Sequence, residues 1–360
     1  MRGSLFLFQL FDVCEALDME TLSRLLGGPG PRRGVAARQP PQVQVWFEPP
    51  PHIHALGEIE FLPGEFFQAE IHHYSYGVAC LRLERAFDLG WPDLVALSTR
   101  WVGASAAESA ASDLIARHLD SIRPALLKPH GGFLTEDYTV VRLDPLPAPS
   151  GFLTAGELLQ SAGGAIARII RGETLPLSPE EQSHILASRL SYYPEDLLVA
   201  GWSAAFLYDT AGGADPSLQL IEYANSQLLE FRFYDELLTR TLRDVYRRID
   251  EGTGMLKRWR LAGEAERFNT VRLDVQELTE RTDNAAKFLS DMFAARLYQL
   301  VAARVGVPDY RRLVDEKLRT AASLYHSMTE RIHQSSALLL ETTIVVILII
   351  DLIFLFRGKS

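Results

Sequence analysis

The feature that most constrains this chain is an apolar segment near its C-terminus. Residues 337–356 read ALLLETTIVVILIIDLIFLF and contain only two charged side chains, Glu341 and Asp351. A helix needs about 20 apolar residues to cross the ~30 Å hydrocarbon core of a bilayer. The segment therefore predicts one C-terminal transmembrane helix, followed by the tail 357–360.

The two acids of this segment need an explanation of their own, because carboxylates inside a bilayer are costly. Glu341 lies in the first turns of the segment and can stay near the headgroups, whereas Asp351 lies close to its far end. Successive residues turn a helix by about 100°, so the two acids lie about 80° apart rather than on one stripe. We interpret them as hydrogen-bonding contacts between helices of an oligomer, not as a proton path.

The composition of the chain is that of a globular protein: 47% of its 360 residues are hydrophobic and 23% are charged. Residues 1–336 suffice for one large domain or two of average size. The two cysteines, Cys14 and Cys80, belong to no CxxC or Cys/His spacing. A disulfide framework and a structural zinc site are therefore not predicted, and a reducing compartment and no cofactor are expected.

Charge is shared unevenly along the sequence. Residues 1–254 hold 20 Lys and Arg against 33 Asp and Glu, a net charge of −13, whereas residues 255–335 hold 14 against 11, a net charge of +3. An acidic body argues against nucleic-acid binding through a broad basic face. The basic region is the part that would approach an anionic membrane surface.

Residues 1–215 predict a soluble α+β body, because segments with a period of two alternate with segments of helical period. The Gly-, Pro- and Arg-rich stretch 27–41 is typical of a loop, and 143–151 is a proline-rich connector and a possible subdivision. The predicted strands are Leu5–Phe11, Gln42–Glu48, one or two strands in Phe66–Leu83, Tyr138–Leu143, and a hairpin within Arg189–Asp209. The predicted helices are Trp91–Trp101, Ala106–Leu127, Ala155–Ile170 and Pro179–Ala187.

Residues 216–336 predict long helices, because apolar residues recur there at steps of three and four. One helix starts near Ser217, a second runs over about Asn269–Arg304, and a third starts near Asp309. We expect an antiparallel hairpin that turns at 306–308. The third helix carries a coiled-coil seam of Val314, Leu318, Ala321, Tyr325, Met328, Ile332, Ser335 and Leu339, which predicts a stalk continuous with the apolar segment.

Polar residues gather on the first long helix. They are Glu222, Asn225, Gln227, Glu230, Arg232, Tyr234 and Asp235. Residues three or four positions apart share a face of a helix. We interpret this set as a buried polar network that docks the helix onto the α+β body, with a small-ligand or effector site as the alternative.

Four of the nine histidines fall within a short stretch of the body. They are His52, His54, His72 and His73. A His-x-His pair on one strand face supplies two nitrogen ligands to zinc or iron. These four residues are the candidate metal ligands. The prolines at Pro49–Pro51 and at Pro63 suggest loops, however, so surface or core histidines are the favoured interpretation.

Three stretches resemble the family named for "required for meiotic nuclear division" proteins, a domain of unknown function. They are SYYPEDLLVAGWSAAFLYD (191–209), LIEYANSQLLEFRFYDELL (220–238) and LETTIVVILIID (340–351). The resemblance is best over residues 190–355. It implies an intracellular or organellar protein that is held in a membrane by its C-terminal helix, and it implies no catalytic residues.

Together these features predict a tail-anchored scaffold or tether that self-associates and is not an enzyme. The N-terminal stretch contains Gln9 and Asp12 within its apolar run, which favours a strand over a signal peptide. The bulk of the chain is therefore expected on the cytoplasmic side of an inner membrane, or on an organellar inner membrane in a eukaryote. The alternatives are a membrane-held metal-dependent enzyme and a ligand sensor, both using the N-terminal body.

Overall fold

The computed structural model describes most of the N-terminal body and part of the helical region. The described residues are 1–28, 50–149, 151–250, 271–273, 275–277, 279–280, 292–324, 344–345 and 347–349. They belong to two compact units. Met1–Phe233 and Leu278–Arg311 form the first unit, and Tyr234–Glu277 and Arg312–Ser360 form the second.

The first unit is built on an eight-stranded sheet with the order β2-β3-β4-β1-β5-β10-β9-β8. Its strands are β1 (Arg2–Leu17), β2 (His52–Leu62), β3 (Glu65–His73), β4 (Val78–Asp88), β5 (Leu126–Leu143), β8 (Arg189–Leu190), β9 (Leu197–Ala200) and β10 (Ala204–Tyr208). Neighbouring strands are antiparallel, except that β10 runs parallel to β5. A small hairpin of β6 (Pro147–Ala148) and β7 (Gly151–Phe152) lies outside this sheet.

Strand β1 lies in the middle of the sheet and is buried on both faces. Every residue from Gly3 to Cys14 is buried, because β4 and β5 flank the strand and helices cover both of its faces. The sequence of this stretch, SLFLFQLFDV, is accordingly apolar at almost every position rather than at every second one. Burying one large apolar side chain stabilises the folded protein by roughly 1.5–3 kcal/mol relative to leaving that side chain exposed.

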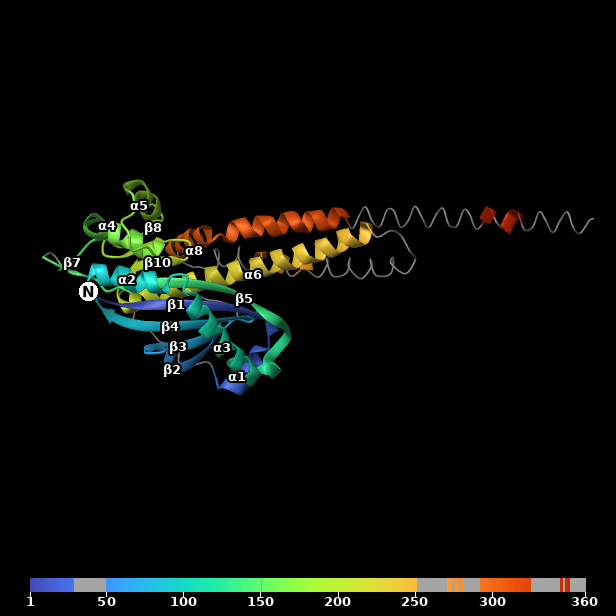
Figure 1. Cartoon of the computed structure of the whole chain (residues 1–360), viewed down its shortest axis with the longest axis horizontal. Coiled ribbons are helices and arrows are strands. Elements are labelled where there is room, and N and C mark those ends of the chain that lie inside the picture. The colour runs from blue at the N-terminus through green and yellow to red at the C-terminus, as the bar shows by residue number, and fades with distance from the viewer. Residues whose placement is uncertain are drawn as a thin grey trace, which may run out of the picture. The chain divides into compact units, whose positions relative to one another are not determined.

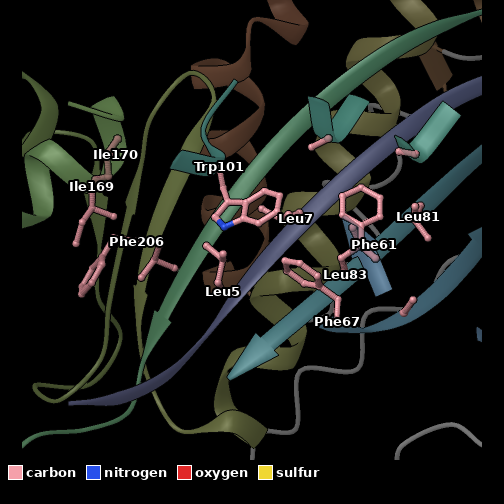
Figure 2. Close-up of a cluster of buried hydrophobic side chains, with 14 of the residues drawn as sticks. Leu5, Leu7, Phe61, Phe67, Leu81, Leu83, Trp101, Ile169, Ile170 and Phe206 are labelled. Atoms are coloured by element: carbon pink, nitrogen blue, oxygen red, sulfur yellow. The ribbon is translucent and has the colours of Figure 1, made fainter. Parts of the chain in front are cut away.

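Helices of the first half of the chain cover one face of the sheet. They are α1 (Met19–Leu26), α2 (Trp91–Trp101), α3 (Ser105–Ser121), α4 (Ala155–Arg171) and α5 (Pro179–Leu186). Trp101 packs its ring edge-on against Phe67 of β3 at 5.2 Å between ring centroids. Figure 2 shows Trp101 near Leu5 and Leu7 of β1, so side chains of α2 and of alternate strand positions share one core.

The first part of helix α6 (Ala211–Asp250) covers the opposite face. Thr210 accepts a hydrogen bond from the Gly213 amide at its Oγ1, which explains why the helix begins earlier than the predicted Ser217. Helix α8 (Met292–Val305) packs beside it, with the rings of Tyr223 and Tyr298 5.8 Å apart. The long α6 and the strands it runs along are visible in Figure 1.

The structure has the expected mixed body followed by helices, and it differs from the predicted elements at several boundaries. Phe66–Leu83 contains two strands joined by a turn at Tyr74–Val78. The helix predicted to reach Leu127 ends at Ser121, because Pro124 starts a 3₁₀ turn (η1, Arg123–Ala125). The strand predicted over Gln42–Glu48 lies outside the described residues.

Strand β2 is absent from the sequence-based prediction. We interpreted the prolines at Pro49–Pro51 and at Pro63 as signs of loops, yet they flank an eleven-residue strand. In the part of the chain that the structure describes, the strand lies at the edge of the sheet and pairs only with β3, so its burial pattern is irregular. Irregular burial weakens the alternation on which strand prediction depends.

In the second unit, α6 and the helical residues 312–324 are joined by Lys317. Its ammonium donates to Oδ1 of Asp235 at 2.6 Å and to Oγ1 of Thr239 at 2.6 Å. Leu238, Val314 and Ala321 are buried in this part of the chain. The helical backbone before it is interrupted at Gly306, whose φ of 97° suits glycine.

The predicted transmembrane helix is corrected by the structure. Within the described residues, no helix is both long and apolar enough to cross a membrane. Of the predicted segment 337–356, only 344–345 and 347–349 are described, and Glu341 and Asp351 lie outside. The membrane, transmembrane-helix and tail-anchored predictions are therefore wrong on this finding, whereas the predicted location stays a prediction. They relied on apolar composition, which measures how strongly a segment avoids water and does not specify a bilayer.

Gly77 offers a test of the contact between the β3–β4 turn and β1. Its φ is 91°, and a Cβ atom there would lie 1.8 Å from the Cys14 carbonyl oxygen. Gly57 has a similar φ of 76° and open space around it. We expect Gly57→Ala to lower the free energy of unfolding by about 1 kcal/mol, the cost of a left-handed backbone. Gly77→Ala should lower it by about 3 kcal/mol or more, because the clash adds to that cost.

Urea unfolding of the two variants and the wild type measures both values. Equal losses for the two variants would show that the turn does not press against Cys14.

Candidate functional site

The interface between α6 and the sheet contains polar side chains that are almost completely buried. Glu222 is 1% exposed and Asn225, Ser226 and Gln227 are 0% exposed. Buried polar groups cost free energy unless they find partners. The hydrogen-bond partners of these four buried side chains therefore determine what the interface can do.

Glu222 forms the centre of this interface through a pair with His72 of β3. Nδ1–H of His72 donates to Oε1 of Glu222 at 2.8 Å, and the Tyr74 hydroxyl donates to the same oxygen at 2.8 Å. The other ring nitrogen of His72 donates to Oε2 of Glu70 at 3.3 Å. Because both ring nitrogens face carboxylate oxygens, which only accept, the ring carries both protons and a positive charge.

The pKa values of the pair follow from this geometry. Burial alone would lower the pKa of His72, but the charge of Glu222 and its hydrogen bond outweigh burial and raise the pKa to about 9. Burial alone would likewise raise the pKa of Glu222, but the charge of His72 outweighs it and lowers that pKa. The site is therefore a buried ion pair over the neutral pH range.

The local sequence of β3 explains how the pair forms. Side chains two positions apart in an extended segment point to the same side, so His72 and Tyr74 both face α6. The turn that follows places Tyr76 beside Tyr74 with ring centroids 5.3 Å apart. The hydroxyl groups of Tyr76 and Ser226 lie 2.6 Å apart. Glu222 and Ser226 are one helical turn apart on α6. Tyr74 and Tyr76, which follow β3, therefore hydrogen-bond to two successive turns of this helix.

Two acceptor oxygens of this interface have no hydrogen-bond partner in the described structure: Oε2 of Glu222 and Oδ1 of Asn225. The amide nitrogen of Asn225 donates to the Ile221 carbonyl at 2.8 Å, which fixes the orientation of the side chain. Burial also raises the pKa of the nearby Tyr74 and Tyr76 hydroxyls and the Cys80 thiol well above their ordinary values. These three groups are therefore neutral.

The other predicted residues of this helix lie apart from Glu222. Glu230 is buried, and Arg232 forms an ion pair with Glu136 of β5. Tyr234 and Asp235 belong to the second unit, where Asp235 accepts from Lys317. The sequence pattern did not reveal that His72 is the partner of Glu222.

The four histidines predicted as metal ligands are divided between the two faces of the sheet. His72 faces α6, whereas His52, His54 and His73 gather around His118 of α3 on the other side. In the part of the chain that the structure describes, no group of three or more His, Cys, Asp or Glu side chains has a metal-binding arrangement. His118 was missed, although it follows Ala107, Ala111 and Ile115 on the buried face of α3.

The fold and this interface describe a mixed α/β domain whose sheet holds a long helix through a buried ion pair. Comparison with known proteins places the chain in a family: it belongs to the one described as "Uncharacterized protein MJ0711, N-terminal domain", which matches residues 2–215. The chain is similar to the "Uncharacterized protein MJ0711" of Methanocaldococcus jannaschii, with 20% identity over 218 residues.

That match covers 61% of this chain and 65% of the relative, so the chain spans just under two thirds of the relative's length. No solved structure matches significantly. None of these findings tests the resemblance to the "required for meiotic nuclear division" family, which stays a prediction.

Removing the carboxylate of the ion pair should be strongly destabilising. Glu222→Gln leaves the His72 charge buried without its main partner, and we expect the free energy of unfolding to fall by about 3–5 kcal/mol. Glu58→Gln, at an exposed position of β2, is the matched control and should change it by less than about 0.5 kcal/mol. Urea unfolding near pH 7 measures both, and a loss below about 1 kcal/mol for Glu222→Gln would contradict the ion pair.

The pair also predicts a loss of stability in alkaline solution. The pKa of His72 rises from 6.5 in the unfolded chain to about 9 in the folded protein. Its stabilising contribution is therefore complete below about pH 6.5 and is lost as the pH rises through 9. A shift of this size corresponds to roughly 3 kcal/mol. Urea unfolding between pH 6 and 10 should show this decline in the wild type and a much smaller one in Glu222→Gln.

Proposed function

We propose that this protein is a scaffold that self-associates through its C-terminal helical region and carries the α+β body as a fixed module. The observation that carries the proposal is the exposure of apolar side chains in that region. Ile344, Val345, Ile347, Leu348 and Ile349 are each 48–60% exposed. Contiguous exposed apolar surface of this kind marks a site of interaction.

A second copy of the chain is the partner that fits this surface best. The segment around these residues is almost free of charge, so its partner must also present apolar groups rather than complementary charges. A second copy supplies the same apolar segment, and closed homo-oligomers are the commonest assemblies of soluble chains.

Helix α6 supports the scaffold role, because one continuous helix of 40 residues contributes to both units. Its first part is held to the sheet by Glu222 and His72, which are 1% and 4% exposed and are thus closed to a substrate. An ion pair in such a position acts in docking the helix. This supports a body that is kept in place by α6 rather than one that turns over a substrate there.

Light scattering coupled to size exclusion, at about 10 μM chain, tests the proposal. We expect the wild type to form an oligomer of defined size. Leu348→Asp places a charge at the most exposed of these apolar positions and should weaken association at least about tenfold, since desolvating an unpaired carboxylate in an apolar interface costs more than about 1.4 kcal/mol.

Thr320→Asp introduces the same side chain at an exposed position of the preceding helix and serves as the control. It should leave the oligomer unchanged. A monomeric wild type, an unaffected Leu348→Asp variant, or recovery of the wild type only as a monomer on lipid vesicles would each reject the proposal.

A further inference from the structure

Four histidines meet where strands β2 and β3 pack against α3. His52 and His73 are a cross-strand pair with ring centroids 6.1 Å apart. The ring of His118 lies 5.0 Å from that of His73 and 5.4 Å from that of His54, on which it stacks. The cluster therefore joins the edge of the sheet to a helix.

The hydrogen bonds of the cluster determine where its protons lie. The carbonyl oxygen of His52 only accepts, so Nδ1 of His73, 3.3 Å away, carries a proton. Nε2 of His73 lies 2.9 Å from Nε2 of His118, and one of these two nitrogens must donate while the other accepts. When His73 is neutral, its Nε2 is the acceptor and His118 donates. A second proton on His73 would place two N–H groups against each other.

His52 extends the cluster to the end of α1. Its Nε2 lies 3.1 Å from the Gly27 carbonyl oxygen and donates to it, because a carbonyl only accepts. The remaining nitrogen, Nδ1, is buried without a partner in the described structure. His52 thus ties the start of β2 to the end of α1 through one ring nitrogen, and its other ring nitrogen lies buried within the cluster.

Among the residues that the structure describes, no carboxylate pairs with any of the four rings. Burial first, and then the neighbouring rings, lower the pKa of His118 to about 4 and that of His73 to about 3. Burial and His52 lower the pKa of His54. The charged neighbours of His118 on α3, Arg117 and Asp120, are exposed, as is Arg24 on α1.

We propose that the cluster of His52, His54, His73 and His118 is an acid-operated lock, which holds α3 and the end of α1 against the β2–β3 edge while His73 and His118 are neutral and releases them when these two rings take up protons. The edge strand β2 is what the opening would expose, because among the described residues it pairs with β3 alone. An exposed edge strand offers unpaired backbone groups to another chain.

The direction of the pH effect follows from the lowered pKa values. A released ring binds a proton with an ordinary pKa of about 6.5, whereas the locked rings of His118 and His73 do so only near 4 and 3. The lock is therefore at full strength above about pH 6.5 and weakens as the pH falls from there toward 4. At pH 5.0, each such ring favours the open state by roughly 30-fold over its effect at pH 7.5.

Hydrogen–deuterium exchange of the full chain at pH 7.5 and 5.0, corrected for the intrinsic rates, tests the lock. In the wild type, we expect protection of peptides from α3, β2 and the end of β3 to fall by at least about 30-fold at pH 5.0, whereas β10 stays protected. His118→Phe keeps an aromatic ring that takes no proton. In His118→Phe, the loss of protection between pH 7.5 and 5.0 should therefore be about 30-fold smaller than in the wild type.

His184→Phe is the matched control, because His184 is exposed on α5, outside the cluster. It should retain the full response. If His118→Phe does not fold, His118→Gln, which keeps a donor and takes no proton, replaces it.

Protection that does not depend on pH in the wild type, or an unchanged fall in the His118 variant, would reject the lock. One transition-metal ion per chain after chelator-free purification, lost in the His118 variant, would also reject it, since the rings would then serve as ligands.

Discussion

The buried charge of His72 is the constraint around which the first unit is arranged. A cation inside a protein is tolerated only where a carboxylate lies against it, and Glu222 and Glu70 both do so. Glu222 comes from α6 and Glu70 from the same strand as His72, so the charge is satisfied only when the helix is docked on the sheet. Apolar packing alone would allow α6 to slide by a turn. The single position of Glu222 disfavours such a shift, because any other register leaves the His72 charge without its main partner.

The docking of α6 matters because the sheet is apolar on both faces. Strand β1 is buried from Gly3 to Cys14, so a helix layer must cover each side. Helices α2, α3 and α4 cover one side with a large apolar core (Figure 2), and α6 with α8 covers the other. The two layers differ in chemistry. The first is apolar up to its edge, where the four histidines lie, whereas the second contains a charged pair at its centre.

His72 and three histidines of the cluster, His52, His54 and His73, come from one short part of the sequence, and their opposite behaviour has a simple physical origin. His72 and His73 are adjacent on β3, so their side chains point to opposite faces. His72 meets two carboxylates and stays charged, whereas His73 meets only other histidines and stays neutral. Neighbouring residues of the same type thus acquire pKa values of about 9 and about 3.

Periodicity in the sequence was enough to find the helices Trp91–Trp101 and Ala155–Arg171 and most of the sheet, because each buries one regular face. It missed β2, whose edge position makes its burial irregular. It also named Glu222 as a polar residue of interest without its partner, since His72 is 150 residues away along the chain.

By itself, then, the sequence determined which segments avoid water and with which period, and hence an α/β body followed by helices. Only the tertiary structure decided which polar groups meet. It paired His72 with Glu222, assembled His118 with the three histidines of β2 and β3, and gave no helix among the described residues that crosses a membrane. The physical reason is that apolar periodicity is a local property of the chain. Charge pairing and the surroundings of an apolar segment depend on residues that only folding brings together.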